Sequence, residues 1–191
     1  LHLGGSETRD TLMAEAAAAR RAGLDVELLA KPEALALADG PCLRFPRQAQ
    51  MSPLRYMAGL VRGIERMGGL IFTGVHVRSF ESGLPVRVTT DGGETVTASA
   101  LVVATNAPVN DRFVIHTKQA AMRTYVVAFE ILRGTVPPAL YWGGDRPYHY
   151  VRVDDTVLGG GSELLLVGGE DHRTGHDEHP EPRWDRLEDW T

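Results

Sequence analysis

The chain has 191 residues, 43% of them hydrophobic and 24% charged, so it can bury a core and is not a disordered polymer. A formal net charge of −5 leaves no positive field for a phosphate backbone or an anionic lipid surface, which favours a small-molecule partner over nucleic acid or membrane. The single cysteine, Cys42, excludes an internal disulfide and a cysteine metal cluster, and the cytoplasm is the expected location.

The chain opens with a predicted helix. Good helix formers run from Leu12 to Ala22 behind Ser6 or Thr8 as N-cap, and Gly23 ends the run. A short strand over 25–29 is expected to follow.

A loop over 32–46 then leads to a second helix with clearer signals. Ser52 and Pro53 form a cap and first-turn pair, and Gly68 follows the last helical turn. Between them apolar residues recur every three or four positions, at Leu54, Met57, Ala58, Val61, Ile64 and Met67.

From residue 70 onwards the pattern changes to β. The first group of predicted strands covers 70–80, 86–90, 95–98 and 101–104. The last of these, Leu101–Ala104, is wholly apolar and is expected to be a buried strand. A second, largely antiparallel sheet is predicted over 118–132, 139–142, 148–153 and 164–167, followed by a polar loop over 170–182 and a helix that runs to the end of the chain.

Five segments stand out by their order and spacing: CLRFPRQAQ (42–50), LVVATNAPVN (101–110), HTKQ (116–119), YHYVR (148–152) and GGEDHRTG (168–175). Together they resemble the flavin-dependent amine and amino-acid oxidoreductases of the D-amino-acid-oxidase (DAO) type. The nearest likeness is to the bacterial branch that often carries a C-terminal Rieske iron–sulfur domain. The resemblance covers nearly the whole chain.

The resemblance implies a mixed α/β (α+β) fold in which a partial FAD-binding Rossmann-like domain is interleaved with an antiparallel-sheet substrate domain. On that template, residues 1–50 and 111–167 belong to the substrate domain. Residues 51–110 belong to the flavin domain, and residues 168–191 return to it.

FAD is the cofactor that the resemblance implies. The sequence contains no G-x-G-x-x-G turn, so the main phosphate-binding loop is expected upstream, and a [2Fe-2S] Rieske cluster is expected only in a downstream domain. Because the chain begins with Leu1 and ends inside an amphipathic helix, we expect it to be a central fragment. By itself it is expected to hold no FAD and to be inactive.

Two short segments are the candidate flavin contacts. On the family template, backbone at Val75 lies near the adenine, although ordinary strand core explains Val75 equally well. Small residues at Ala104 and Thr105 would allow the backbone to approach the pyrophosphate. The family usually has glycine where this chain has Asn106, a residue that tolerates a positive φ better than most.

The candidate substrate pocket lies in the second sheet. Tyr148, Tyr150 and Arg152 alternate along one strand and so point to one face, where aromatic walls and a cation would suit an amine or an amino-acid carboxylate. A solvated sheet face is the alternative. Lys118 is a candidate near the flavin ring or an ordinary strand-entry lysine, and His172 is a further pocket candidate.

Three histidines and four carboxylates fall within residues 170–179, but their spacing matches no metal motif, and we expect no metal.

The expected function is oxidation of a C–N bond of a small amine or amino acid, with FAD receiving the hydride. No catalytic residue is assigned. The alternative is a non-catalytic ligand-binding or interaction domain. The expected partners are the substrate and the rest of the polypeptide, and no apolar run is long enough for membrane insertion.

Overall fold

The computed structural model describes residues 9–31, 40–106, 119–144, 147–156, 158–175 and 181–191. Within these residues, helices and antiparallel strands form the mixed α/β fold that the sequence predicts. The chain divides into two compact units: residues 1–50 with 116–191 form the first unit, and residues 51–115 form the second. Which unit binds flavin and which binds substrate stays a prediction.

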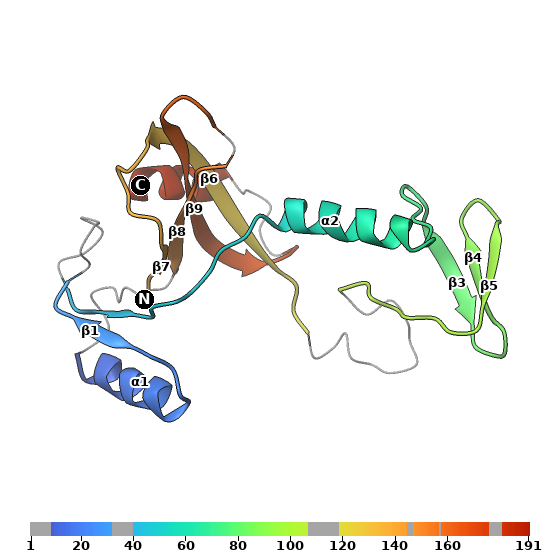
Figure 1. The fold of residues 1–191 in the computed structure, drawn as a ribbon, viewed down its shortest axis with the longest axis horizontal. Helices are drawn as coiled ribbons and strands as arrows, with labels where there is room; N and C mark the ends of the chain where they lie inside the picture. Colours follow the sequence, from blue (N-terminus) through green and yellow to red (C-terminus); the bar gives the residue numbers. More distant parts are fainter. Residues whose placement is uncertain (1–8, 32–39, 107–118, 145–146, 157, 176–180) are drawn as a thin grey trace. The chain divides into compact units, whose positions relative to one another are not determined.

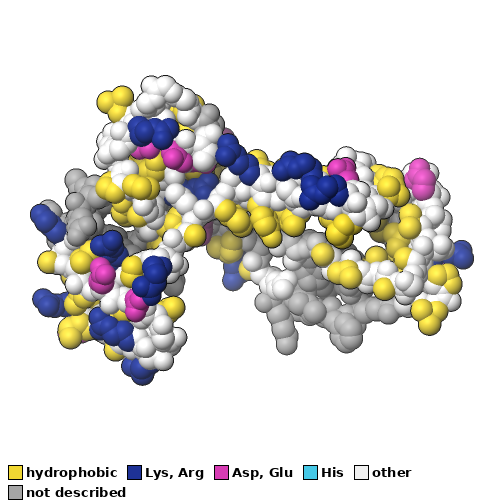
Figure 2. Space-filling model, in the orientation of Figure 1, with side chains coloured by type: hydrophobic (Ala, Val, Ile, Leu, Met, Phe, Trp, Pro, Cys, Tyr) yellow, Lys and Arg dark blue, Asp and Glu magenta, His cyan; other side chains and the backbone are white. Residues whose placement is uncertain are grey.

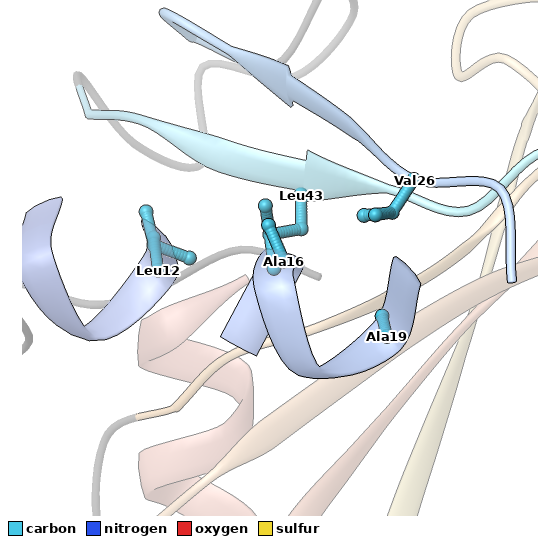
Figure 3. Close-up of a cluster of buried hydrophobic side chains, with 5 residues drawn as sticks. All are labelled: Leu12, Ala16, Ala19, Val26 and Leu43. Carbon is cyan, nitrogen blue, oxygen red and sulfur yellow. The ribbon is translucent and has the colours of Figure 1, made fainter. Parts of the chain in front are cut away.

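The N-terminal helix α1 (Arg9–Arg21) packs on the hairpin of β1 (Glu27–Leu29) and β2 (Cys42–Arg44). The apolar positions of α1 recur at helical spacing, so their side chains form one buried stripe. Figure 3 shows this stripe facing Val26 and Leu43 across the cluster, with Leu12, Ala16 and Ala19 contributed by the helix. The predicted loop over 32–46 is wrong at β2, where Leu43 completes this core and its neighbour Cys42 is also buried.

Helix α2 (Pro53–Arg66) begins where the sequence predicts. Ser52 lies in extended backbone, and its Oγ accepts a hydrogen bond from the amide of Arg55 at 3.5 Å. The helix is strongly amphipathic, yet none of its residues is buried in the described part of the chain. Figure 2 shows the apolar side chains gathered along one side of α2, with basic side chains along another.

Three antiparallel strands follow α2 in the second unit: β3 (Val77–Glu81), β4 (Val86–Thr90) and β5 (Thr95–Ala98). The turn after β4 is closed by Thr90 and Glu94, whose side chains hydrogen-bond to each other, while the amide of Glu94 donates to Thr90 Oγ1 at 3.1 Å. The hydrogen bond from Thr90 lowers the pKa of Glu94 below its ordinary value. The contact that closes the turn therefore favours the ionised form of this carboxylate.

The prediction of a buried strand over 101–104 is wrong. This segment has no regular secondary structure, and the side chain of Val102 is 86% exposed. An apolar run becomes a strand only where neighbouring strands satisfy its backbone hydrogen bonds, and none of the described strands pairs with it.

The larger sheet of the first unit has the strand order β6-β9-β8-β7, all antiparallel. Its strands are β6 (Met122–Leu132), β7 (Leu140–Trp142), β8 (His149–Asp154) and β9 (Ser162–Arg173). Strand β9 continues far beyond the predicted 164–167, and residues 170–173 pair with β6 instead of forming the predicted polar loop.

Helix α3 (Glu181–Trp190) lies against one face of this sheet, in contact with β6 and β9 (Figure 1). Its Leu187 is fully buried in a cluster with Tyr125, Val127, Val151 and Val167. Residues 168–191 therefore group with the first unit rather than with residues 51–110, because β9 is continuous and α3 packs on it. Among the described helices, none has the length and apolar character needed to cross a membrane.

Replacing Leu187 with alanine tests this packing. We expect Leu187→Ala to lower the free energy of unfolding of the first unit by about 2–5 kcal/mol, because a fully buried side chain leaves a cavity. Urea unfolding followed by tryptophan fluorescence measures it, since all three tryptophans lie in the first unit. Leu24→Ala, at a half-exposed site, is the control, and equal losses in both variants would contradict the assigned core.

Candidate functional site

The four-stranded sheet has one face covered by α3 and one face that α3 does not touch. We call the second the open face and define it by residues that lie directly opposite one another across the strands. One row is Trp142, Tyr150, Gly168 and Val126, and the next is Leu140, Arg152, Leu166 and Ala128. The open face is therefore largely apolar and aromatic, with a guanidinium set among these side chains.

Tyr150 lies flat on the open face because Gly168 stands opposite it. A Cβ at Gly168 would overlap the ring and hydroxyl of Tyr150, so only glycine leaves room for the ring to cover β9 at this point. The ring of Tyr148 lies beside that of Tyr150, with centroids 6.1 Å apart and planes tilted by 34°. Two phenol rings thus form a wall on the open face.

Tyr148, Tyr150 and Arg152 share this face, as their alternation predicts. Tyr148 is 39% exposed, and Tyr150 and Arg152 are partly buried. Among the described residues, the Arg152 guanidinium has neither a hydrogen bond nor an ion pair, so its charge is available to an anion. Their part in binding a substrate stays a prediction.

A β-bulge changes the alternation of β9 just beyond Gly168. The pairing steps from Tyr125–Gly169 to Arg123–His172, so β9 contains one more residue than β6 over this stretch. Glu170, within the bulge, has a φ of 57°, in the left-handed region. As a result His172 lies on the face covered by α3, stacked on Tyr125 at 5.6 Å, and not beside Tyr148 and Tyr150.

The bulge also buries the carboxylate of Glu170 against α3. This side chain is 3% exposed, and its Oε2 accepts from Arg186 at 2.6–2.8 Å, with Arg183 at 3.7 Å. His149 Nε2 lies 3.7 Å from the other carboxylate oxygen, and the His149 ring stacks on Trp190 of α3. Charge and ring contacts together hold α3 on the covered face.

Asp171 is the site residue that sequence reasoning missed. Because its neighbours Glu170 and His172 both face α3, Asp171 projects onto the open face, close to the hydroxyl of Tyr148. Burial first, and then the negative charge of Asp171, raise the pKa of Tyr148 above its ordinary value. The consecutive glycines Gly168 and Gly169 were the available signal for a bulge.

The predicted flavin contacts all lie in the second unit and are accessible. Val75 is 52% exposed and precedes β3, so it is not the strand-core residue that the alternative reading expected. Ala104 and Thr105 are exposed, and Asn106 has a φ of 62°, the conformation that the usual glycine would adopt. The turn can therefore form without glycine at this position.

Two further predictions concern residues at the limits of the described structure. Lys118 lies outside the described residues. Of the histidine- and acid-rich segment, the described part ends at Gly175, and no group of three metal-ligating side chains is found within the described ranges.

The open face and the exposed turn belong to a chain that matches a family model over almost its whole length. The model, described as DAO, FAD dependent oxidoreductase, matches residues 1–190. The chain belongs to this family. The resemblance is thus confirmed at the level of a FAD-dependent oxidoreductase, whereas comparisons with curated proteins and with solved structures found no match.

Membership of the DAO family implies FAD, and the turn at Ala104–Asn106 fits part of that cofactor. Ala104 and Thr105 have small side chains, all three residues are exposed, and the left-handed Asn106 turns the chain there. Backbone amides in such a turn suit phosphate oxygens, which need donors and close approach more than side-chain charge. These residues would hold the phosphate region of FAD.

Gly168 provides a direct test of the aromatic wall. We expect Gly168→Ala to displace the Tyr150 ring and to lower the free energy of unfolding by about 1–3 kcal/mol, because the added methyl overlaps the ring. Tyrosine ring NMR signals and urea unfolding measure the two effects. Gly159→Ala, where a Cβ meets no atom within 4 Å, is the control. An unmoved Tyr150 signal in Gly168→Ala would contradict the arrangement.

The pKa of Tyr148 gives a second test. A raised pKa means that the folded protein disfavours the phenolate, so its contribution to stability is present below pH 10.0 and is lost as the pH rises through the folded pKa. NMR titration should show Tyr148 ionising at higher pH than an ordinary tyrosine. Asp171→Asn should lower that pKa, whereas Asp155→Asn, at an exposed site, should leave it unchanged. A Tyr148 titration insensitive to Asp171 would refute the contact.

Proposed function

We propose that this member of the DAO family oxidises the C–N bond of a small amine or amino acid, with the open face as its substrate-binding surface. The observation that carries the proposal is the Arg152 guanidinium, which has no ion pair among the described residues and shares an otherwise largely apolar face with Tyr150. An apolar surface with few polar groups is typical of small-molecule sites. A guanidinium on such a surface recognises a carboxylate in two-point fashion.

The residues of the open face have binding and orienting roles in this proposal. FAD, when bound, supplies the redox chemistry by accepting a hydride equivalent. Arg152 would hold the substrate carboxylate, and the rings of Tyr148 and Tyr150 would exclude water from its carbon chain. No residue is assigned as a general base in this proposal.

The proposed function predicts that the complete protein is reduced by amines. Produced from its complete open reading frame and loaded with FAD, it should lose the absorbance of oxidised flavin when mixed anaerobically with the appropriate amine or amino acid. Reduction by alcohols or hydroxy acids alone would overturn the C–N assignment. Failure to take up FAD would favour a ligand-binding role.

Arg152 can be tested with a matched pair of substrates, an amino acid and the same amine without its carboxylate. We expect Arg152→Gln to raise KM for the amino acid about 10- to 100-fold, since a hydrogen bond to a charged group contributes about 1.5–3 kcal/mol. KM for the amine should not change. Arg44→Gln, which removes an exposed arginine paired with Glu27, is the control. Equal effects on both substrates would contradict a carboxylate contact.

A further inference from the structure

A second charged residue lies on the open face, of opposite sign to Arg152. The bulge in β9 directs Asp171 to the side of the sheet that carries Tyr148 and Tyr150. In a regular strand this position would face α3, where Glu170 and His172 are found. The placement of Asp171 is therefore a specific consequence of the bulge.

The carboxylate of Asp171 is only partly satisfied within the described structure, where the Tyr148 hydroxyl is its hydrogen-bond partner. Its Oδ1 is buried and has no hydrogen-bond partner, and none of the ion pairs among the described residues includes it. A partly desolvated carboxylate with one oxygen unpartnered and no ion pair is unfavourable unless a cation or a further donor approaches it. The residue as a whole is only partly buried, so such a group can reach it.

The surroundings of Asp171 favour an organic cation. One side of the Tyr150 ring rests on Gly168, which leaves its other side turned away from the sheet, and Tyr148 adds a second ring at 6.1 Å. Aromatic faces attract ammonium groups through their quadrupole and cover the attached carbon atoms. A small inorganic cation would gain less, because two rings and one carboxylate offer few oxygen ligands.

We propose that Asp171, together with the rings of Tyr148 and Tyr150, forms a subsite for an alkylammonium group on the open face. This inference rests on the proposed function and names the residue that recognises the positive charge of an amine substrate. Tyr148 and Arg152 are four residues apart on one extended segment, a Cα separation of about 13 Å. The open face is thus polarised, with the ammonium subsite at the bulged end of β9 and the carboxylate-binding guanidinium at the other.

The subsite can be tested without flavin, on the 191-residue chain labelled with ¹³C in its tyrosine rings. Propylammonium chloride is titrated against 1-propanol at constant ionic strength. We expect the signals of Tyr148 and Tyr150 to shift and saturate with the cation but not with the alcohol, whereas Tyr56 in the second unit stays unchanged. Equal shifts with propanol, or shifts that do not saturate, would overturn the proposal.

Variants separate the carboxylate from the rings. Asp171→Asn should weaken propylammonium binding at least about fivefold, the loss expected for one opposite charge at contact distance. Tyr148→Leu keeps the charge and should weaken binding about two- to fivefold. Asp155→Asn removes an equal charge from an exposed site and should change nothing. Unaltered affinity in Asp171→Asn would refute the subsite.

The outcomes distinguish this inference from the proposed function. Cation binding that depends on Asp171, in a protein whose flavin no amine reduces, would retain the subsite and reject the C–N assignment. Reduction by amines with a KM unaffected by Asp171→Asn would do the reverse.

Discussion

Glu170 is buried at the point where β9 departs from regular alternation, and its carboxylate contacts the guanidinium of Arg186 at 2.6 Å. A carboxylate that has lost water on nearly every side needs such a partner, because an unpaired buried charge costs far more than a surface ion pair contributes. Arg186 and Arg183 both belong to α3. The ion pairs that Glu170 needs therefore hold that helix against the sheet. The packing of α3 on the covered face leaves the open face without contacts from that helix.

The same bulge determines the chemistry of the open face. One additional residue in β9 moves His172 to the covered side, where it stacks on Tyr125, and brings Asp171 to the side of Tyr148. The glycine before the bulge leaves room for the ring of Tyr150. Aromatic surface, an anion and a cation without an ion pair among the described residues therefore lie on one sheet face of the first unit, and the positions of Asp171 and of the Tyr150 ring depend on a few residues of β9.

Elements with strong periodicity could be predicted from the sequence. The three-to-four spacing from Leu54 to Met67 gave α2 with its Ser52 cap, and the alternation of Tyr148, Tyr150 and Arg152 placed three side chains on one face. The side to which His172 and Asp171 point could not be derived in this way. A period of two fails at a bulge, and Gly168–Gly169 indicates that a bulge is possible without giving its register.

Other differences arise from tertiary context. The segment Leu101–Ala104 has the composition of a buried strand, but no described strand pairs with it, and composition alone does not supply backbone partners. Conversely, Cys42–Arg44 is too short to be read as a strand, and it forms one because Leu43 completes the core under α1. In both cases the neighbouring element decides the outcome more than local propensity does.

Family membership concerns the redox chemistry, whereas the open face concerns the choice of substrate. Belonging to the DAO family assigns the redox chemistry to FAD. Because the cofactor performs the reaction, the protein has to bind the substrate, orient it and exclude water from it. Differences in substrate within such a family must then come from the groups that face the substrate, since the fold alone does not determine function. In the proposed function those groups are two rings with a charge of each sign near either end. Under that proposal, a substrate that satisfied both charges would lie on the face in one direction only, and the polarity of the open face would decide which of its C–N bonds is presented for oxidation.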